Sequence, residues 1–191
     1  MKRPIKPRKE KSKIIIATED KESSPNYFKE VIKYFNICQR DVKIILASPK
    51  GESGKSNPTN VYKRAKSEYL KDDIVYIVVD KDNHKDFDKV KNDTLKKANW
   101  NFIPSVPCFE YWLLLHYKTT DKPFKSSEVT TELSKLIKED KQIKYHKNID
   151  MSIFMDKIDT AVRNSKNYKE SNNPSTKVHE VIEKLQSCKN K

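Results

Sequence analysis

The sequence predicts an α/β protein, with a parallel sheet of about four strands flanked by helices and a helical C-terminal appendage. The first observation is the run Ile74–Val79, which is apolar, largely β-branched and bounded by charged residues. Such a run is typical of a strand buried on both faces inside a parallel sheet. The second is that similar short runs alternate with helical patterns before Tyr117. The third is that only amphipathic helical patterns follow Tyr117.

The first strand is expected at Ile14–Thr18 and the second at Val42–Ala47. Between them, Pro25 suits the first turn of a helix whose apolar residues recur at helical spacing. Further helices are expected over residues 58–70 and 86–98, and a fourth strand over Asn101–Ile103 that ends at Pro104. This βαβαβαβ order predicts right-handed crossovers, and it gives the strand order 2-1-3-4 if strands one and three are neighbours.

Residues 105–117 are the most apolar and aromatic part of the chain and predict a buried helix packed on the sheet. Later helices are expected over residues 127–139, with Ser127 as N-cap, and over 153–165 and 176–186. We therefore expect three parts. A basic flexible arm covers residues 1–13, an α/β domain covers 14–117, and a helical part over 118–191 packs on the same core.

The charge balance favours a polyanionic partner. Forty Lys and Arg residues against 27 Asp and Glu residues give a net charge of +13. This surplus indicates nucleic acid first and an anionic membrane surface second, although part of the lysine excess also serves solvation. Three widely spaced cysteines without a C-x-x-C pair argue against a disulfide framework or a zinc ribbon. The sequence shows no transmembrane-length apolar run and no signal-peptide pattern, so we expect a cytoplasmic protein without a membrane partner.

Acidic residues follow two of the predicted strands. Glu19 comes after the first strand, and Asp80 and Asp82 come after the third. Because strand side chains alternate, Asp80 and Asp82 would project to the same side, at the edge where open α/β sheets bind ligands. Carboxylate oxygens suit Mg²⁺ or Mn²⁺, with Glu19 as a further ligand or a general acid–base. The alternative is that the two aspartates only end a strand and begin a loop.

Several further residues have two interpretations. His84 either contacts a phosphate or a metal-bound water, or lies on a loop surface. Glu110 either favours the N-terminus of its helix electrostatically or faces the metal site. Tyr145 and Lys147 either contact nucleic acid, with the tyrosine stacked on a base, or belong to a solvated loop. His116 is favoured as a packed core histidine.

The segment Gly54-Lys55-Ser56 resembles the end of a phosphate-binding P-loop, but Pro49 occupies the position of the required first glycine. We reject that motif. A flexible polar loop beside the active edge is the expected role, in which lysines contact the nucleic-acid backbone. The lysines expected to do so are Lys50, Lys55, Lys81 and Lys147.

The acidic residues and several longer stretches of the chain resemble those of known families. A strand ending in Glu and a later strand ending in Asp-x-Asp is similar to the Toprim domain of topoisomerases, primases and OLD-type nucleases. The whole chain resembles the RloB-like (AbiLii-type) family, which is Toprim-related and encoded beside AAA-type ATPases in bacterial defence loci. The stretches that carry this resemblance are Glu19 with Pro25-Asn26-Tyr27-Phe28, Val79–His84, Pro107–His116 and Asn173–His179.

The resemblance implies a Mg²⁺-dependent nuclease effector of antiphage defence that is controlled by an AAA/ABC-type ATPase and cleaves RNA, with tRNA the first expectation. The chain departs from the family pattern at several positions, including Val106, where an Asn is common. Asp20 replaces a glycine, and Ser24 stands where a second acid is usual, which puts a second metal site in doubt. The alternatives are a non-catalytic subunit that binds nucleic acid or a partner, and a DNA-nicking enzyme.

Overall fold

The computed structural model describes residues 12–48, 56–81, 84–120, 122–166, 169 and 172–189. Its centre is a five-stranded sheet with the order β2-β1-β3-β4-β5. The strands are β1 (Ile14–Thr18), β2 (Val42–Leu46), β3 (Ile74–Asp80), β4 (Trp100–Val106) and β5 (Ser175–Thr176). The first four are parallel and β5 pairs antiparallel with β4. The predicted α/β class and the order 2-1-3-4 are confirmed, and β5 is an addition that the sequence did not predict.

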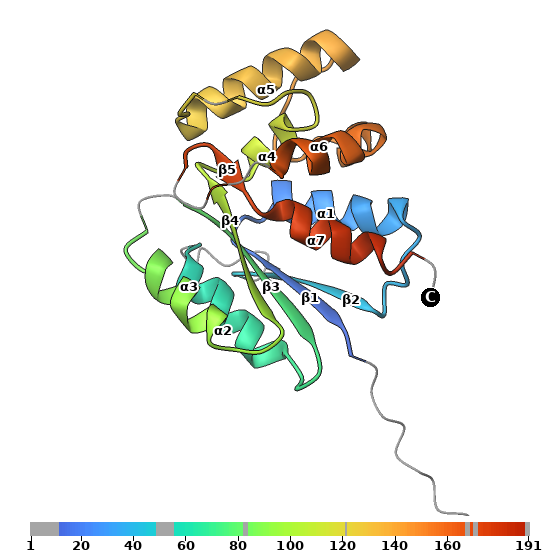
Figure 1. Cartoon of the computed structure of the whole chain (residues 1–191). Coiled ribbons are helices and arrows are strands. Elements are labelled where there is room, and N and C mark those ends of the chain that lie inside the picture. Colours follow the sequence, from blue (N-terminus) through green and yellow to red (C-terminus); the bar gives the residue numbers. More distant parts are fainter. Residues whose placement is uncertain are drawn as a thin grey trace, which may run out of the picture.

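Helices cover both faces of the sheet (Figure 1). Helices α2 (Pro58–Glu68) and α3 (Phe87–Leu95) lie on one face. Helices α1 (Ser23–Tyr34) and α7 (Val178–Gln186) lie side by side on the other. Beyond them are the short α4, the long α5, the 3₁₀ helix η1 and α6, with bounds Glu110–Leu114, Ser126–Lys141, Met151–Lys157 and Ile158–Ser165. None of the helices in the described part of the chain is long and apolar enough to cross a membrane.

Alternation along the strands divides the apolar side chains between two cores. Ile15, Ala17 and Ile77 belong to the smaller core, which also contains residues of α2 and α3. Ile16 and Val78 belong to the larger core, together with residues of α1, α4, α5, α6 and α7. Both faces of the central strands are therefore buried, which explains why Ile74–Val79 is an unbroken apolar run rather than an alternating one.

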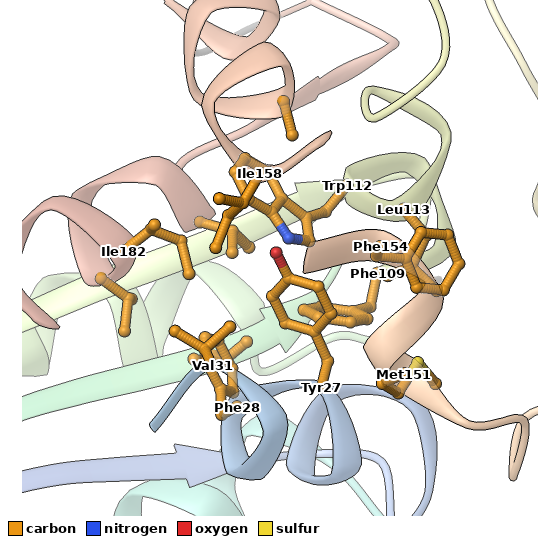
Figure 2. Close-up of a cluster of buried hydrophobic side chains, with 14 of the residues drawn as sticks. Tyr27, Phe28, Val31, Phe109, Trp112, Leu113, Met151, Phe154, Ile158 and Ile182 are labelled. Atoms are coloured by element: carbon orange, nitrogen blue, oxygen red, sulfur yellow. The ribbon is translucent and has the colours of Figure 1, made fainter. Parts of the chain in front are cut away.

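The larger core is centred on Tyr27 of α1 (Figure 2). The ring of Tyr27 lies edge-on to Phe109, Trp112 and Phe154, with centroid distances of 5.8, 6.1 and 6.5 Å. All four side chains are fully buried or nearly so. Because Phe154 comes from η1 and Ile182 of α7 joins the same cluster, apolar residues from the C-terminal third pack directly against α1 and the sheet.

His116 also lies in this core, as its apolar surroundings predicted. Its Nδ1 lies 3.1 Å from the Trp112 carbonyl oxygen and 3.2 Å from that of Leu113. Carbonyl oxygens only accept, so Nδ1 carries the proton and Nε2 accepts a hydrogen bond from the Tyr27 hydroxyl at 3.0 Å. Burial lowers the pKa of His116 to about 3, so the imidazole is neutral.

The fourth strand is longer than predicted and continues through Pro104, which lies opposite Val79. The Pro104 carbonyl accepts a hydrogen bond from the Lys177 amide on the side away from β3. The proline nitrogen faces that same side, so β3 loses no partner. The helix expected over residues 105–117 is consequently reduced to α4.

Two details of the C-terminal part were also predicted wrongly. Helix α5 begins at Ser126, and its first turn is closed by the Glu128 carboxylate, which accepts from the Lys125 amide at 2.7 Å. Ser127 is therefore not the N-cap. Thr176, expected to begin the last helix, instead pairs with β4 together with Ser175, and the two residues form β5.

Candidate active site at the carboxyl edge of the sheet

The sheet brings Glu19 and Asp80 together. Strands β1 and β3 are neighbours, with Thr18 opposite Val78, so both chains leave the sheet at the same edge. The Glu19 amide donates to the Val78 carbonyl at 3.1 Å. Glu19 is only 8% exposed, and its carboxylate accepts a hydrogen bond from the Asp80 amide at 3.2 Å through Oε2. The predicted meeting of these two residues is thus a consequence of parallel pairing.

His84 reaches back to the same carboxylate. Its Nε2 lies 2.9 Å from Oε1 of Glu19, and its side chain is partly exposed. The carbonyl oxygen of Glu19 accepts a hydrogen bond from the Ser56 hydroxyl. Both oxygens of the Glu19 side chain therefore have a nitrogen partner, and His84, on its partly exposed loop, contacts this carboxylate.

Three of the predicted site residues, Asp82, Lys50 and Lys55, lie outside the described residues. Lys81 is described: its side chain is exposed directly after β3, and its amide donates to the Ser105 carbonyl at 2.8 Å. Lys81 is thus held at the carboxyl edge by its backbone.

Asp20 contacts the N-terminus of α1. Its Oδ1 accepts from the Glu22 amide at 2.7 Å, and its Oδ2 accepts from the Ser24 amide at 3.0 Å. Oδ2 also accepts a hydrogen bond from the Ser24 hydroxyl. These bonds satisfy amides at the start of the helix, where a negative charge is also favourable. A carboxylate therefore lies within hydrogen-bonding distance of Ser24, the position at which the resemblance led us to expect an acid.

Glu110, the first residue of α4, is 4% exposed and contacts other elements. Its Oε1 accepts from the Ser23 hydroxyl at 3.1 Å and from the Tyr145 hydroxyl at 3.4 Å. Tyr145 is itself buried, and burial together with the Glu110 charge raises the pKa of its hydroxyl. Tyr145 is therefore not free to stack on a base; it links the loop before η1 to α1 and α4.

Lys147, on the same loop, forms an ion pair with Glu110. Its Nζ lies 3.6 Å from Oε1 of Glu110. Burial alone would lower the pKa of this ammonium, but the charges of Glu110, Asp20 and Asp80 outweigh it and raise the pKa. Lys147 therefore remains a cation, and it is close enough to these three acids to sense their charge.

Cys108 does not provide a nucleophile. The side chain is 5% exposed, and burial, followed by the charges of Glu110 and Asp80, raises the pKa of its thiol. A thiol held neutral is a poor nucleophile and a poor metal ligand. All three cysteines are free, in agreement with their spacing.

The donor set suits a hard divalent cation. Mg²⁺ commonly binds through one or two protein carboxylates and keeps several waters, and Glu19 and Asp80 supply two such groups. Among the described residues, no three His, Cys, Asp or Glu side chains are grouped closely enough to hold a metal by themselves. The described residues therefore fit a cation bound mainly through water and phosphate oxygens, rather than an all-protein cage.

Sequence reasoning missed three contributors to this region: Asp20, Ser23 and Asp86. Asp86 accepts from the Thr59 amide at 2.9 Å and ties the loop after β3 to the start of α2. An aspartate shortly before a helix that begins near a proline is an N-cap signal, so Asp20 was detectable. Ser23 and Asp86 depend on contacts across the fold and have no local signal.

The fold and the edge residues define an α/β protein with an acidic site at the carboxyl ends of adjacent parallel strands. The model of the RloB-like protein family matches residues 14–185. The chain therefore belongs to the RloB-like family, as its motifs indicated. No curated protein and no solved structure matches the sequence.

Proposed function

We propose that this protein is a metal-dependent nuclease that hydrolyses phosphodiester bonds in RNA, with tRNA as the first candidate. The observation that supports the proposal best is the pair Glu19 and Asp80 at the carboxyl edge, with His84 in contact with Glu19. Lys147 pairs with Glu110, and the charge of Asp80 contributes to its raised pKa. A net charge of +13 on the whole chain favours a polyanionic substrate. In such a nuclease the acidic residues hold the metal ion, and the basic residues bind the phosphates of the substrate.

The residues that would hold Mg²⁺ or Mn²⁺ are Asp80 and Glu19, joined by Asp82. When bound, the cation neutralises the scissile phosphate and lowers the pKa of a coordinated water. Glu19 is oriented for this task by its bonds to the Asp80 amide and to His84. His84, on the partly exposed side of Glu19, is placed to contact a phosphate oxygen or to exchange a proton with water.

Lys147 would stabilise the negative charge that develops on the phosphate. Its raised pKa keeps it protonated. Glu110 holds one side of the ammonium while more than half of the side chain remains exposed. Lys81, exposed after β3, would bind a backbone phosphate, and we propose the same role for Lys50 and Lys55.

Family membership supports the biological setting. From the resemblance to the RloB-like family we expect a role in antiphage defence, in which a partner ATPase of the AAA/ABC type controls the nuclease. Ser24 favours a second candidate, a non-catalytic subunit that binds nucleic acid or the partner, because the usual acid is absent there. The Asp20 carboxylate beside Ser24 weighs against that candidate, since negative charge is retained at the same place.

The decisive experiment incubates the purified protein with total bacterial RNA and with plasmid DNA, in Mg²⁺ or in EDTA. Asp80→Asn tests the acidic edge. Asp72→Asn is the matched control, because Asp72 is exposed in the turn that precedes the same strand, away from that edge. RNA fragments that require metal and disappear only with Asp80→Asn support the proposal. Nicked plasmid with intact RNA would establish a DNA enzyme. If neither is cut, even with the ATPase present, the binding subunit is the better description.

A further inference from the structure

A pocket of about 220 Å³ is lined by residues of β5, α4 and α6 and of the segments around them. Figure 1 shows β5 at the edge of the sheet, near α4 and α6. Three threonines, three asparagines, two serines, one tyrosine and one proline line it. None of these described lining residues is charged, although 35% of the chain is. The described lining residues therefore offer no cation to bind a phosphate. Amide and hydroxyl groups, which both donate and accept, instead match the polar edge of an uncharged ring system.

The register of the sheet relates this pocket to the acidic edge. Asp80 pairs with Ser105 on β4, and Ser105 pairs with Thr176 on β5. The hydroxyls of Ser105 and Thr176 are 3.0 Å apart, so the two side chains share a face of the sheet. Paired strand residues point to the same face, which places Asp80 on it as well. Thr176 lines the pocket, and two strand spacings of about 4.8 Å separate it from Asp80.

Helix α4 provides a second connection. Glu110, which holds Lys147, and Tyr111, which lines the pocket, are consecutive residues. The acidic edge and the pocket thus share both a helix and a row of strand residues. A ligand that extends about 10 Å from Asp80 across the sheet reaches the pocket, and a single-stranded nucleic acid covers that length in a few nucleotides.

Two lining groups are free to bind a ligand. Asn164 donates through Nδ2 to the Leu115 carbonyl at 2.8 Å. Within the described part of the chain, the Asn164 Oδ1 and the Thr119 hydroxyl have no hydrogen-bond partner. The volume is below the roughly 300–1,000 Å³ of pockets that hold drug-sized molecules, so it suits one base rather than a dinucleotide.

We propose that this pocket receives an unstacked base of the single-stranded substrate, adjacent to the phosphate held at the Glu19–Asp80 edge. The proposal rests on the nuclease function proposed above and adds the means of choosing a cleavage position. Neutral side chains read the hydrogen-bonding edge of the base, while the lysines at the acidic edge bind the backbone without regard to sequence.

The test measures binding of short, fluorescent RNA homopolymers of A, C, G and U by anisotropy, in EDTA so that no RNA is cut. Thr119→Trp fills the pocket from its rim, and Thr119→Val removes the hydroxyl while keeping the shape. Thr119 is exposed, so both variants should fold. Asn92→Trp, at an exposed position on α3, controls for an added aromatic ring.

We expect the wild-type protein to prefer one base by about tenfold, the discrimination that one or two base-edge hydrogen bonds provide. Both Thr119 variants should reduce that preference several-fold, and Asn92→Trp should retain it. Equal affinities in the wild-type protein, or a preference unchanged by both Thr119 variants, would overturn the pocket inference and leave the proposed nuclease intact. If the wild-type protein binds none of the RNAs, the proposed function itself fails.

Discussion

The Glu19 carboxylate accepts a hydrogen bond from the backbone amide of Asp80, 61 positions later in the chain, at 3.2 Å. The contact exists because β1 and β3 are adjacent and parallel, so that both end at the same edge. The backbone amide of Asp80 thus orients the carboxylate of Glu19. A buried carboxylate requires hydrogen-bond partners or compensating positive charge. The Asp80 amide and the His84 ring nitrogen contact the two oxygens of Glu19, and a divalent cation would supply positive charge.

Mg²⁺ or Mn²⁺ should stabilise the folded protein. A ligand that binds only the folded state at 100 times its dissociation constant adds about 2.7 kcal/mol to the free energy of unfolding. We expect Mn²⁺ to raise the melting temperature of the wild-type protein, and Asp80→Asn and Glu19→Gln to remove most of that increase. Thermal denaturation with and without the cation measures it. Asp72→Asn should respond as the wild type does, and an equal response of all variants would refute metal binding at this edge.

Lys147→Met should reduce cleavage by roughly 10- to 100-fold, because loss of one group that stabilises transition-state charge has effects of about this size or larger. The melting temperature should change little, since the Lys147 side chain is more than half exposed. Cleavage rate and melting temperature are both measured. Lys144→Met, on the same loop and exposed, is the matched control and should change neither. A Lys147 variant with unchanged cleavage would remove this residue from the mechanism.

Much of the sheet was predictable because parallel strands produce a local signal. A strand buried on both faces must be apolar throughout, so Ile74–Val79 identified the centre of the sheet and the residues after it identified the edge. The order 2-1-3-4 was expected only if strands one and three are neighbours, and the sheet shows that they are. What the sequence did not reveal was β5, since a two-residue strand has no periodicity.

Contacts between distant segments explain the remaining differences. Pro104 was taken as the end of a strand because proline lacks an amide hydrogen, but its nitrogen faces away from β3 and the strand continues. Tyr145 was placed on a loop in an otherwise basic segment, yet its hydroxyl reaches Glu110 and Ser23 inside the fold. Neither outcome is encoded in neighbouring residues; each depends on which element packs alongside.

Asp20→Ala should destabilise the protein by about 1 kcal/mol, the usual effect of losing a side chain that caps a helix. The amides of Glu22 and Ser24 would lose their partner. Urea denaturation measures the change in the free energy of unfolding. Asp72→Ala, at an exposed position outside the helices, should have little effect. Equal stability of the Asp20 variant and the wild type would show that water replaces the cap without loss.

His116 should make the protein sensitive to acid. Its pKa is about 3 in the folded chain, against 6.5 without the fold. Above pH 6.5 both states are neutral and the residue adds no pH dependence. Between pH 6.5 and 3 the unfolded chain binds a proton that the folded chain does not. The free energy of unfolding should therefore decrease by up to about 1.4 kcal/mol per pH unit from this group alone.

His116→Gln removes that titration, so its free energy of unfolding should fall less steeply with decreasing pH than that of the wild type. His146→Gln, at an exposed loop position, should retain the wild-type slope. Denaturant titrations at several pH values below 6.5 give the slopes. Identical slopes for the wild type and the His116 variant would mean that the imidazole is protonated in the folded protein or titrates normally.

Phe154→Ala tests whether the helical C-terminal part and the α/β part unfold together. Removing a fully buried phenylalanine costs about 3–5 kcal/mol. Phe154 packs in the larger core with Trp112, whereas Trp100 lies in the smaller core on the other face of the sheet. These are the two tryptophans of the chain. In a Trp112→Phe background, the fluorescence of Trp100 therefore reports the face that Phe154 does not contact.

If the two parts share one core, they unfold in one cooperative transition. Phe154→Ala should then lower the denaturation midpoint measured by Trp100 fluorescence and the midpoint measured by helical circular dichroism by the same amount. Ile143→Ala, at a site 39% exposed, should shift neither midpoint appreciably. A Trp100 midpoint that stays in place while helical signal is lost earlier would show that residues 118–191 unfold as a separate unit. The continuous cluster from Ile14 through Phe154 to Leu185 favours the single transition.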